Sequence, residues 1–371
     1  MRGSHGRIRD LKEANLQERF IGMILGVAIG DAVGAPVEGW TRETIQTVLG
    51  CVRGYQMTVM GKGFYTDETQ MTLVLLRSIL NCRGFDPADF GTQIGEWMRL
   101  SDEGIESARG VGRTISLAAR KLYRGIPWDQ SGEYSASNGA AVRIAPLSLL
   151  YHDTEDIKHF MDDVENSCRP THIESHAIQG AKVIALALYL LVKEDKFLFD
   201  RLKFLDDLIM LSKRHAPRVI GSLVPLRKYI SSPIEHKVFE QPNVGRAFRC
   251  KERINETDNR FSVLEEIGTG KYVLESVPAA LYCFLNTPEN FEETILTAVN
   301  AGGDADSIAS IAGALSGALN GAPAIPMRWL MDLENREEII ELASRLYDHT
   351  LGLEMPEGAI YISTARFSIK S

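Results

Sequence analysis

The sequence is poor in cysteine: it has five in 371 residues. They are scattered, none forms a CxxC pair, and none lies at zinc-finger spacing. This pattern excludes a disulfide-stapled scaffold and a zinc finger, and an odd number of cysteines is typical of a reducing cytoplasm. A chain of this length can bury a hydrophobic core that is large enough to stabilise the fold without disulfide bonds. We therefore expect a cytoplasmic protein whose fold depends on that core.

The chain also lacks an excess of positive charge and long apolar runs. The chain has 41 Lys and Arg residues and 49 Asp and Glu residues, which gives a net charge of −8. This balance argues against sequence-independent nucleic-acid binding, which needs a basic surface. The longest uninterrupted apolar stretches have about 11 residues, short of the ~18–20 that cross a bilayer. We expect neither a nucleic-acid partner nor a membrane.

Convincing alternating strands, solenoid repeats and Pro/Gly/Ser linkers are scarce or absent as well. The sequence therefore favours an all-α protein with one large domain, residues 19–371. Residues 1–18 are polar and begin MRGSHG, like a vector-derived leader, so we set them apart as an N-terminal extension or leader. The polar, irregular stretch 236–262 predicts a loop insertion, and the alternating stretch 357–370 predicts a short C-terminal hairpin.

Four segments have the pattern of apolar helices: 20–35, 66–80, 174–193 and 303–320. In the first of them, glycine recurs at every fourth position: Gly22, Gly26, Gly30 and Gly34. On a helix this spacing makes one stripe without side chains, and each glycine costs roughly 1 kcal/mol. The stripe predicts close approach of another helix backbone. The segment 303–320 has a small-residue stripe of its own beside an apolar face.

Acidic residues gather at three places near helix ends: Glu38, Thr66–Glu68 and Asp304–Ser307. Two of these clusters combine carboxylates with a hydroxyl at the start of an apolar helix. Hard cations such as Mg²⁺ prefer such oxygen ligands. The same residue types also cap helices and favour the positive end of the helix dipole. The residues alone leave capping and metal binding about equally open, and Glu38 alone reads as a surface carboxylate.

Two turns and one histidine pair are weaker signals. Small polar residues at 135–139 suit contact with a phosphate, although an ordinary helix-entry turn is the simpler interpretation. The Gly-x-Gly turn at 268–270 lacks the third glycine of a dinucleotide fingerprint. His172 and His176 are four residues apart, but HExxH is absent and zinc is not favoured.

Taken in order, these motifs resemble the ADP-ribosylglycohydrolase family, the group that includes the dinitrogenase-reductase-activating glycohydrolase. The resemblance runs through FIGMILGVAIGDAVGAPVEG, FYTDETQMTL, SASNGAAVRIAPL, the TH pair at 171–172, GTGKYVLESVPAALYCF and NAGGDADSIASIAGALSGALNG. It covers roughly residues 19–325. It implies a single compact many-helix fold, all-α, that carries two Mg²⁺ (or Mn²⁺) ions.

The resemblance also implies a role for each matching position. Glu38 matches the glutamate that acts near the scissile bond. The implied metal ligands are Thr66, Asp67, Glu68, Asp304, Asp306 and Ser307. The implied substrate-binding residues are Ser135, Ser137, Asn138, Gly139, His172 and Tyr272. Glu68 stands where the family usually has Asp, and Ser307 where it has Thr; the first change puts full metal occupancy or rate in question.

The implied activity is metal-dependent hydrolysis that removes ADP-ribose from a modified protein side chain. The protein could act in regulation or as an antidote (an immunity protein) to an ADP-ribosyltransferase toxin, which would then be a partner. The charged stretch before Phe20 could dock such a partner, and we expect a monomer. Two alternatives stay open: a catalytically weak or inactive relative that acts as a binding or inhibitory protein, and a metal-dependent phosphatase.

Overall fold

The computed structural model of the chain describes residues 2–231 and 259–353. The predicted hairpin at 357–370 lies outside the described residues, and so does most of the predicted insertion at 236–262. The last four residues of that insertion, 259–262, were predicted as loop and are helical, because they begin α13 (Asn259–Ile267). Phe261 explains the difference, since its buried ring ties this turn to the core.

The described residues form helices and contain no strand, which confirms the all-α prediction. The α-helices are α1 (Arg2–Gly34), α2 (Arg42–Leu49), α3 (Asp67–Cys82), α4 (Pro87–Asp102), α5 (Arg113–Tyr123), α6 (Gly139–Val142), α7 (Ala145–Leu150), α8 (Ile157–Cys168), α9 (Ser175–Leu191), α10 (Arg201–His215), α11 (Ile220–Leu223), α12 (Leu226–Ile230), α13 (Asn259–Ile267), α14 (Val273–Asn286), α15 (Phe291–Ala301), α16 (Ala305–Asn320), α17 (Met327–Asp332) and α18 (Arg336–Thr350). Short 3₁₀ turns are η1 (Ala35–Val37), η2 (Pro217–Val219) and η3 (Ala322–Ala324).

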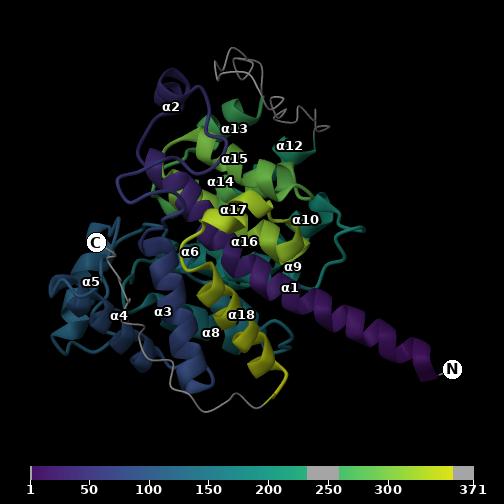
Figure 1. The fold of residues 1–371 in the computed structure, drawn as a ribbon, viewed down its shortest axis with the longest axis horizontal. Coiled ribbons are helices and arrows are strands. Elements are labelled where there is room, and N and C mark those ends of the chain that lie inside the picture. Colours follow the sequence, from purple (N-terminus) through teal and green to yellow (C-terminus); the bar gives the residue numbers. More distant parts are fainter. Residues whose placement is uncertain (1, 232–258, 354–371) are drawn as a thin grey trace.

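Helices α1 and α16 pack backbone to backbone at the centre of the protein (Figure 1). A Cβ atom added to Gly26 would lie 2.1 Å from the carbonyl oxygen of Gly313. One added to Gly30 would lie equally close, 2.1 Å, to the carbonyl oxygen of Ala309. A side chain of any size would push the two helices apart. The predicted close approach of a helix to the glycine stripe is confirmed, and the second small-residue stripe supplies that helix.

Helix α16 is buried on all sides, because every one of its residues from Ala305 to Asn320 is buried. The sequence predicted one apolar face and one small-residue stripe. The stripe contacts α1, whereas the rest of the helix surface contacts α9, α14 and α15. A helix in this position forms the axis of the core, and its N-terminus starts at the acidic segment 304–307.

Helix α1 extends well beyond its glycine stripe. It runs unbroken from Arg2, so residues 2–18 belong to the same helix as the stripe, and this part projects from the body in Figure 1. The stretch Asn15–Val37 is long and apolar enough to cross a membrane by length and composition, because it contains an 18-residue window with a mean hydropathy of 1.8. However, 83% of that window is buried inside the protein, which is typical of a core helix.

The remaining helices surround this axis. Helices α3, α4 and α5 follow one another on one side, and α18 packs on α1 and α3. Helix α9 lies against α6, α7, α8 and α10. The loops that leave α1, α5, α13 and α15 lead into the segments that the sequence singled out, and these segments carry the site described next.

Candidate metal centre

Three of the predicted carboxylates meet at the N-terminus of α16. Glu38, Asp304 and Asp306 each offer one oxygen atom, and these oxygens all lie within 4.8 Å of one another. It is the one such group of at least three His, Cys, Asp or Glu side chains among the residues that the structure describes. Glu38 is therefore not an isolated surface carboxylate, because it faces two nearly inaccessible aspartates.

Backbone pairing brings these distant segments together. The N–H of Gly303 donates to the carbonyl of Trp40 over 2.8 Å, and the N–H of Gly39 donates to the carbonyl of Gly303 over 2.8 Å. Gly302 and Gly303 both have positive φ, 75° and 76°. A Cβ on Gly302 would lie 2.5 Å from the Trp40 carbonyl oxygen. Glycine is thus required here by both the backbone conformation and the close approach.

Asp304 occupies the N-cap position of α16 but its side chain caps nothing. Its Oδ2 accepts a hydrogen bond of 2.6 Å from Asn138 Nδ2. Its Oδ1 is buried and has no hydrogen-bond partner among the described residues. A buried carboxylate oxygen without a partner is costly. A divalent cation would satisfy it, so the observation favours metal binding over capping, and the residues present fit the implied ions.

The second acidic cluster forms the opposite wall. Glu68 is partly buried in the first turn of α3, and its Oε1 accepts a 2.6 Å hydrogen bond from Ser307 Oγ on α16. Asp67 is 5% exposed and is held by its backbone N–H, which donates to the Arg109 carbonyl over 2.7 Å. The two clusters that the sequence placed at separate helix starts therefore converge. The longer Glu68 side chain reaches the hydroxyl of Ser307.

Asp31 is a key residue of the site that the sequence analysis missed. Its carboxylate is fully buried and accepts hydrogen bonds from the backbone N–H and the hydroxyl of both Thr66 and Thr69. Asp31 thus caps α3 from α1. Thr66 occupies the N-cap position of α3, but its own side chain makes no capping hydrogen bond. The available signal was an acid inside an otherwise apolar segment.

Electrostatics set these carboxylates apart from the surface. Burial raises the pKa of Asp67 to about 7, and the charges of Asp31 and Glu38 act in the same direction. Burial, joined by neighbouring carboxylates, also raises the pKa of Glu68 and of Asp306 well above their usual range. The site therefore holds more negative charge than its protein surroundings can neutralise. Bound cations would supply what is missing.

Lys271 is the nearest cation, and the sequence analysis did not single it out. Its Nζ donates to Glu38 Oε1 over 2.5 Å and lies 3.8 Å from Asp304 Oδ1. Burial would lower the pKa of Lys271, but its hydrogen bond to Glu38 and the charges of Asp304 and Glu38 outweigh that effect and raise it. The ammonium group is therefore charged.

The predicted phosphate turn lies beside this centre. Asn138 reaches Asp304 as described, and Ser137 Oγ is 2.8 Å from His172 Nε2. The other ring nitrogen, Nδ1, is 2.8 Å from Thr171 Oγ1. Burial, with a smaller contribution from Arg143, lowers the pKa of His172 to about 3, so the ring is neutral. Both ring nitrogens are occupied by hydroxyls, which leaves neither for zinc.

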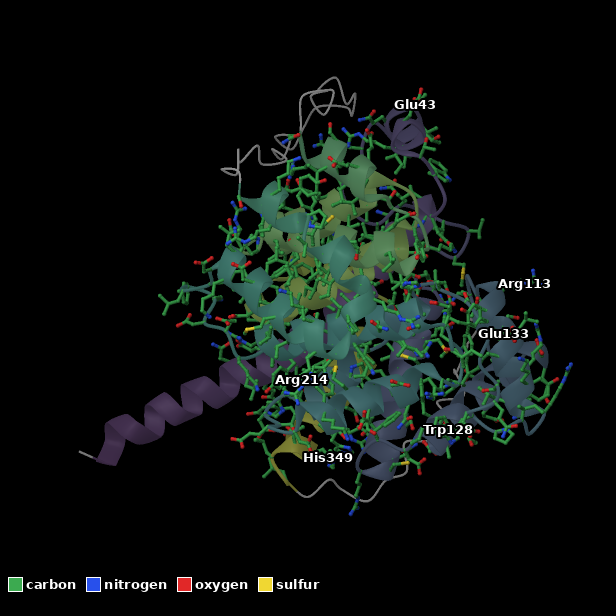
Figure 2. All side chains as sticks on the ribbon, turned by 180° about the vertical axis from the view of Figure 1, so that it is seen from behind. Glu43, Arg113, Trp128, Glu133, Arg214 and His349 are labelled. Atoms are coloured by element: carbon green, nitrogen blue, oxygen red, sulfur yellow. The ribbon has the colours of Figure 1, made fainter. Side chains whose placement is uncertain are left out.

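The turn is fixed by its neighbours on two sides. Ser135 Oγ accepts a 3.0 Å hydrogen bond from Thr114 Oγ1 at the start of α5, and Figure 2 shows Arg113 and Glu133, which flank this contact, on the same side of the molecule. On the other side, the N–H of Val273 donates to the Ala136 carbonyl over 3.0 Å.

The last two predicted substrate residues lie on or beside this turn. Gly139 is buried, and a Cβ there would lie 3.2 Å from Ile115 Cδ1. Tyr272 pairs with Ser137 through an isolated bridge and is 41% exposed, with its ring next to His176. The structure brings all the predicted site residues into one connected region, whereas their individual roles stay predictions.

Fold and site together define an all-helical protein with a buried, oxygen-rich acidic centre suited to hard cations. The chain belongs to the ADP-ribosylglycohydrolase family, whose pattern it matches over residues 12–354. Membership places it among hydrolases that act on glycosidic bonds. The family resemblance noted in the sequence is thereby confirmed.

Individual relatives agree with this assignment. An uncharacterised protein of Archaeoglobus fulgidus is 33% identical over 336 residues, which cover 90% of this chain and 97% of that protein. The ADP-ribosylhydrolase ARH3 of Mus musculus is 28% identical over 357 residues, covering 89% of this chain and 91% of ARH3. The solved structure of an ADP-ribosylglycohydrolase-related protein complex matches with a TM-score of 0.62 and 28% identity. It covers 91% of this chain and 99% of that one.

Proposed function

We propose that the protein is a divalent-cation-dependent hydrolase that removes ADP-ribose from a modified protein side chain. The observation that carries the proposal is the buried Oδ1 of Asp304, which accepts no hydrogen bond from the described residues and lies within a group of three carboxylates beside the Asn138 turn. Similarity to ARH3, an ADP-ribosylhydrolase, supports the substrate class. The proposed cofactor is two Mg²⁺ or Mn²⁺ ions.

The two walls of the site would hold the cations between them. One wall comes from the start of α3 and the other from the start of α16, and their candidate ligands are Thr66, Asp67, Glu68, Asp304, Asp306 and Ser307. Cations bound there would polarise a water molecule and orient the hydroxyls of the ribose. Asp31 fixes Thr66 by accepting its hydroxyl proton, so a lone pair of Thr66 Oγ1 is left for a cation.

The chain's own residues would handle the substrate and the proton. Cleavage at the ribose C1″ passes through an oxocarbenium-like state, and a carboxylate near that carbon can take the proton of the attacking water or return one to the leaving atom. Glu38 is the candidate for this role. Ser135, Ser137 and Asn138 would bind the diphosphate, and His172 would hold the Ser137 hydroxyl in place.

A panel of defined substrates tests the proposal. Proteins or peptides ADP-ribosylated on Arg, Ser or Asn, together with O-acetyl-ADP-ribose and ADP-ribosylated nucleic acid, are incubated with Mg²⁺, with Mn²⁺ or with EDTA. We expect release of free ADP-ribose from a protein-linked substrate with a cation and none with EDTA. Absence of release from every substrate, or release of inorganic phosphate instead, would contradict it.

The biological setting is a further part of the proposal. We propose a cytoplasmic monomer that acts on an ADP-ribosylated protein, either in regulation or as an antidote to an ADP-ribosyltransferase. The alternative of a weak or inactive relative is supported by one observation: Glu68 uses one carboxylate oxygen to accept the Ser307 hydroxyl. Cation binding without hydrolysis of any substrate in the panel would favour this alternative.

A further inference from the structure

Lys271 lies on a turn whose backbone is held from two directions. The Lys271 carbonyl accepts a 3.2 Å hydrogen bond from the N–H of Asn138, in the phosphate turn. Two residues earlier, the Thr269 carbonyl accepts a 2.7 Å hydrogen bond from the N–H of Asp304. The backbone at Lys271 is thus held beside the acidic centre by the same segments that form that centre. Its side chain has a fixed starting point from which to reach the carboxylates.

The ammonium group lies at the edge of the candidate cation position. It contacts Glu38 Oε1 at 2.5 Å and approaches Asp304 Oδ1 at 3.8 Å. The latter oxygen is the one without a hydrogen-bond partner. Two of the three carboxylates whose oxygens cluster within 4.8 Å therefore face one positive charge carried by the chain itself.

We propose that Lys271 is a tethered competitor of the divalent cation: its ammonium group neutralises Glu38 and Asp304 before a cation binds and is displaced when one does. The inference rests on the proposed function, because it assumes that this centre binds a divalent cation. Two like charges that share the same carboxylates repel each other, and a carboxylate oxygen held by an ammonium group is less available to a metal. Lys271 therefore lowers the affinity of the site for its first cation.

The side chain can leave without disturbing the fold. The Lys271 side chain is 60% exposed, and its four-carbon stem is flexible, so the displaced ammonium group has solvent to move into. The residue that follows, Tyr272, borders the proposed substrate region. Displacement would free Glu38 for the proton transfer proposed above, so cation binding and the release of Glu38 become one event.

Cation titration with a charge-removing and a charge-conserving variant tests the proposal. Binding of Mn²⁺ to the full chain is measured by electron paramagnetic resonance for wild type, Lys271→Met and Lys271→Arg. We expect Lys271→Met to bind the first Mn²⁺ about tenfold more tightly than wild type, a change typical of one neighbouring charge that is partly screened by solvent. Lys271→Arg keeps the charge and should bind like wild type.

Lys203→Met is the matched control. Lys203 is also an exposed lysine in an ion pair, with its Nζ 3.0 Å from Asp207 Oδ2, but it lies on α10 away from the acidic centre. We expect no change in Mn²⁺ affinity. Circular dichroism verifies that each variant is folded, and Lys271→Met should show a larger rise in Tm on Mn²⁺ addition than wild type.

The outcomes separate this inference from the proposed function. If wild type binds Mn²⁺ and Lys271→Met binds with equal or weaker affinity, the competitor role is wrong and the metal centre stands. A merely structural role of Lys271 would give the weaker affinity, opposite in sign to our expectation. If neither wild type nor any variant binds Mn²⁺, the proposed metal-dependent function and the inference both fail.

Discussion

The middle of the α1–α16 pair and the end where α16 begins are stabilised in opposite ways. Along the middle, Gly26 and Gly30 meet the backbone of α16 with no space for a single methyl group. At the end where α16 begins, the same two helices contribute Asp31 and Asp306, which are buried among other charged and polar groups. Apolar contact stabilises the first region, whereas the second buries negative charge at a cost to stability. The comparison teaches that the rigid pair fixes the position of a site that is itself electrostatically unfavourable without cations.

Removal of one carboxylate from the acidic end tests this difference between the two regions with the largest expected effect. Asp304→Asn keeps the size of the side chain but removes the charge that faces the candidate cation position. We expect release of ADP-ribose to fall by roughly 1000-fold, at the upper end of what loss of one well-placed electrostatic group causes, and Mn²⁺ affinity to fall with it. Unchanged release in a folded Asp304→Asn protein would contradict the assignment of the site.

A substitution in the packed middle of the α1–α16 pair should change the stability of the protein and not the chemistry of the site. In Gly30→Ala the new methyl group would lie 2.1 Å from the Ala309 carbonyl oxygen, so the helices must separate. We expect a loss of about 3 kcal/mol in the free energy of unfolding, measured by urea denaturation. In the control Gly221→Ala, the helical glycine has open space around it, and a gain of about 0.5–1 kcal/mol is expected. Equal effects of both changes would show that the close approach is unimportant.

Asp31 joins the two regions, so its variant should affect both. Asp31→Asn places an amide group opposite four hydrogen-bond donors, and at least one donor loses its acceptor. We expect a loss of about 1–3 kcal/mol in the free energy of unfolding, together with weaker Mn²⁺ binding because Thr66 shifts. Asp86→Asn is the control: Asp86 caps α4 from an exposed position, and Asn caps about as well. A stable Asp31→Asn protein with unchanged Mn²⁺ affinity would exclude the positioning role.

The smallest expected effect concerns pH in the absence of cations. The folded-state pKa of Asp67 is raised to about 7, above its value in the unfolded chain, so the folded state binds this proton more tightly. Stability therefore falls as pH rises from about 5 through 7, by about 2–4 °C in Tm. Saturating Mg²⁺ should remove the decrease, and Asp67→Asn should make it smaller. A Tm of the EDTA-treated wild type that rises over this interval would contradict the picture.

The sequence predicted the packed region far better than the acidic centre. The glycine stripe is a local pattern, and its spacing already implies a face that another helix can approach, so the prediction needed no knowledge of the fold. The carboxylates at 38, 67–68 and 304–306 come from separate turns. Their convergence depends on the backbone pairing at Gly303 and on the α3 cap supplied by Asp31, which no local pattern reveals. The ordered set of motifs found the site through family resemblance.

Lys271 and Asp31 show why the rest could not be predicted. Each is one charged residue in a segment noted for other features, a Gly-x-Gly turn and a glycine-striped helix. Their importance comes from partners that are distant in the sequence: Glu38 for Lys271, and Thr66 and Thr69 for Asp31. Only the folded chain shows that these charges face the acidic centre.

The most direct test of the central claim is a reversible cation-removal assay on one protein preparation. ADP-ribose release from an ADP-ribosylated protein is followed with Mg²⁺, after addition of EDTA, and after restoration of excess Mg²⁺, with Asp304→Asn in parallel. We predict release that stops with EDTA and recovers with Mg²⁺, and none of this response in the variant. Release that continues at the same rate in EDTA would contradict the account.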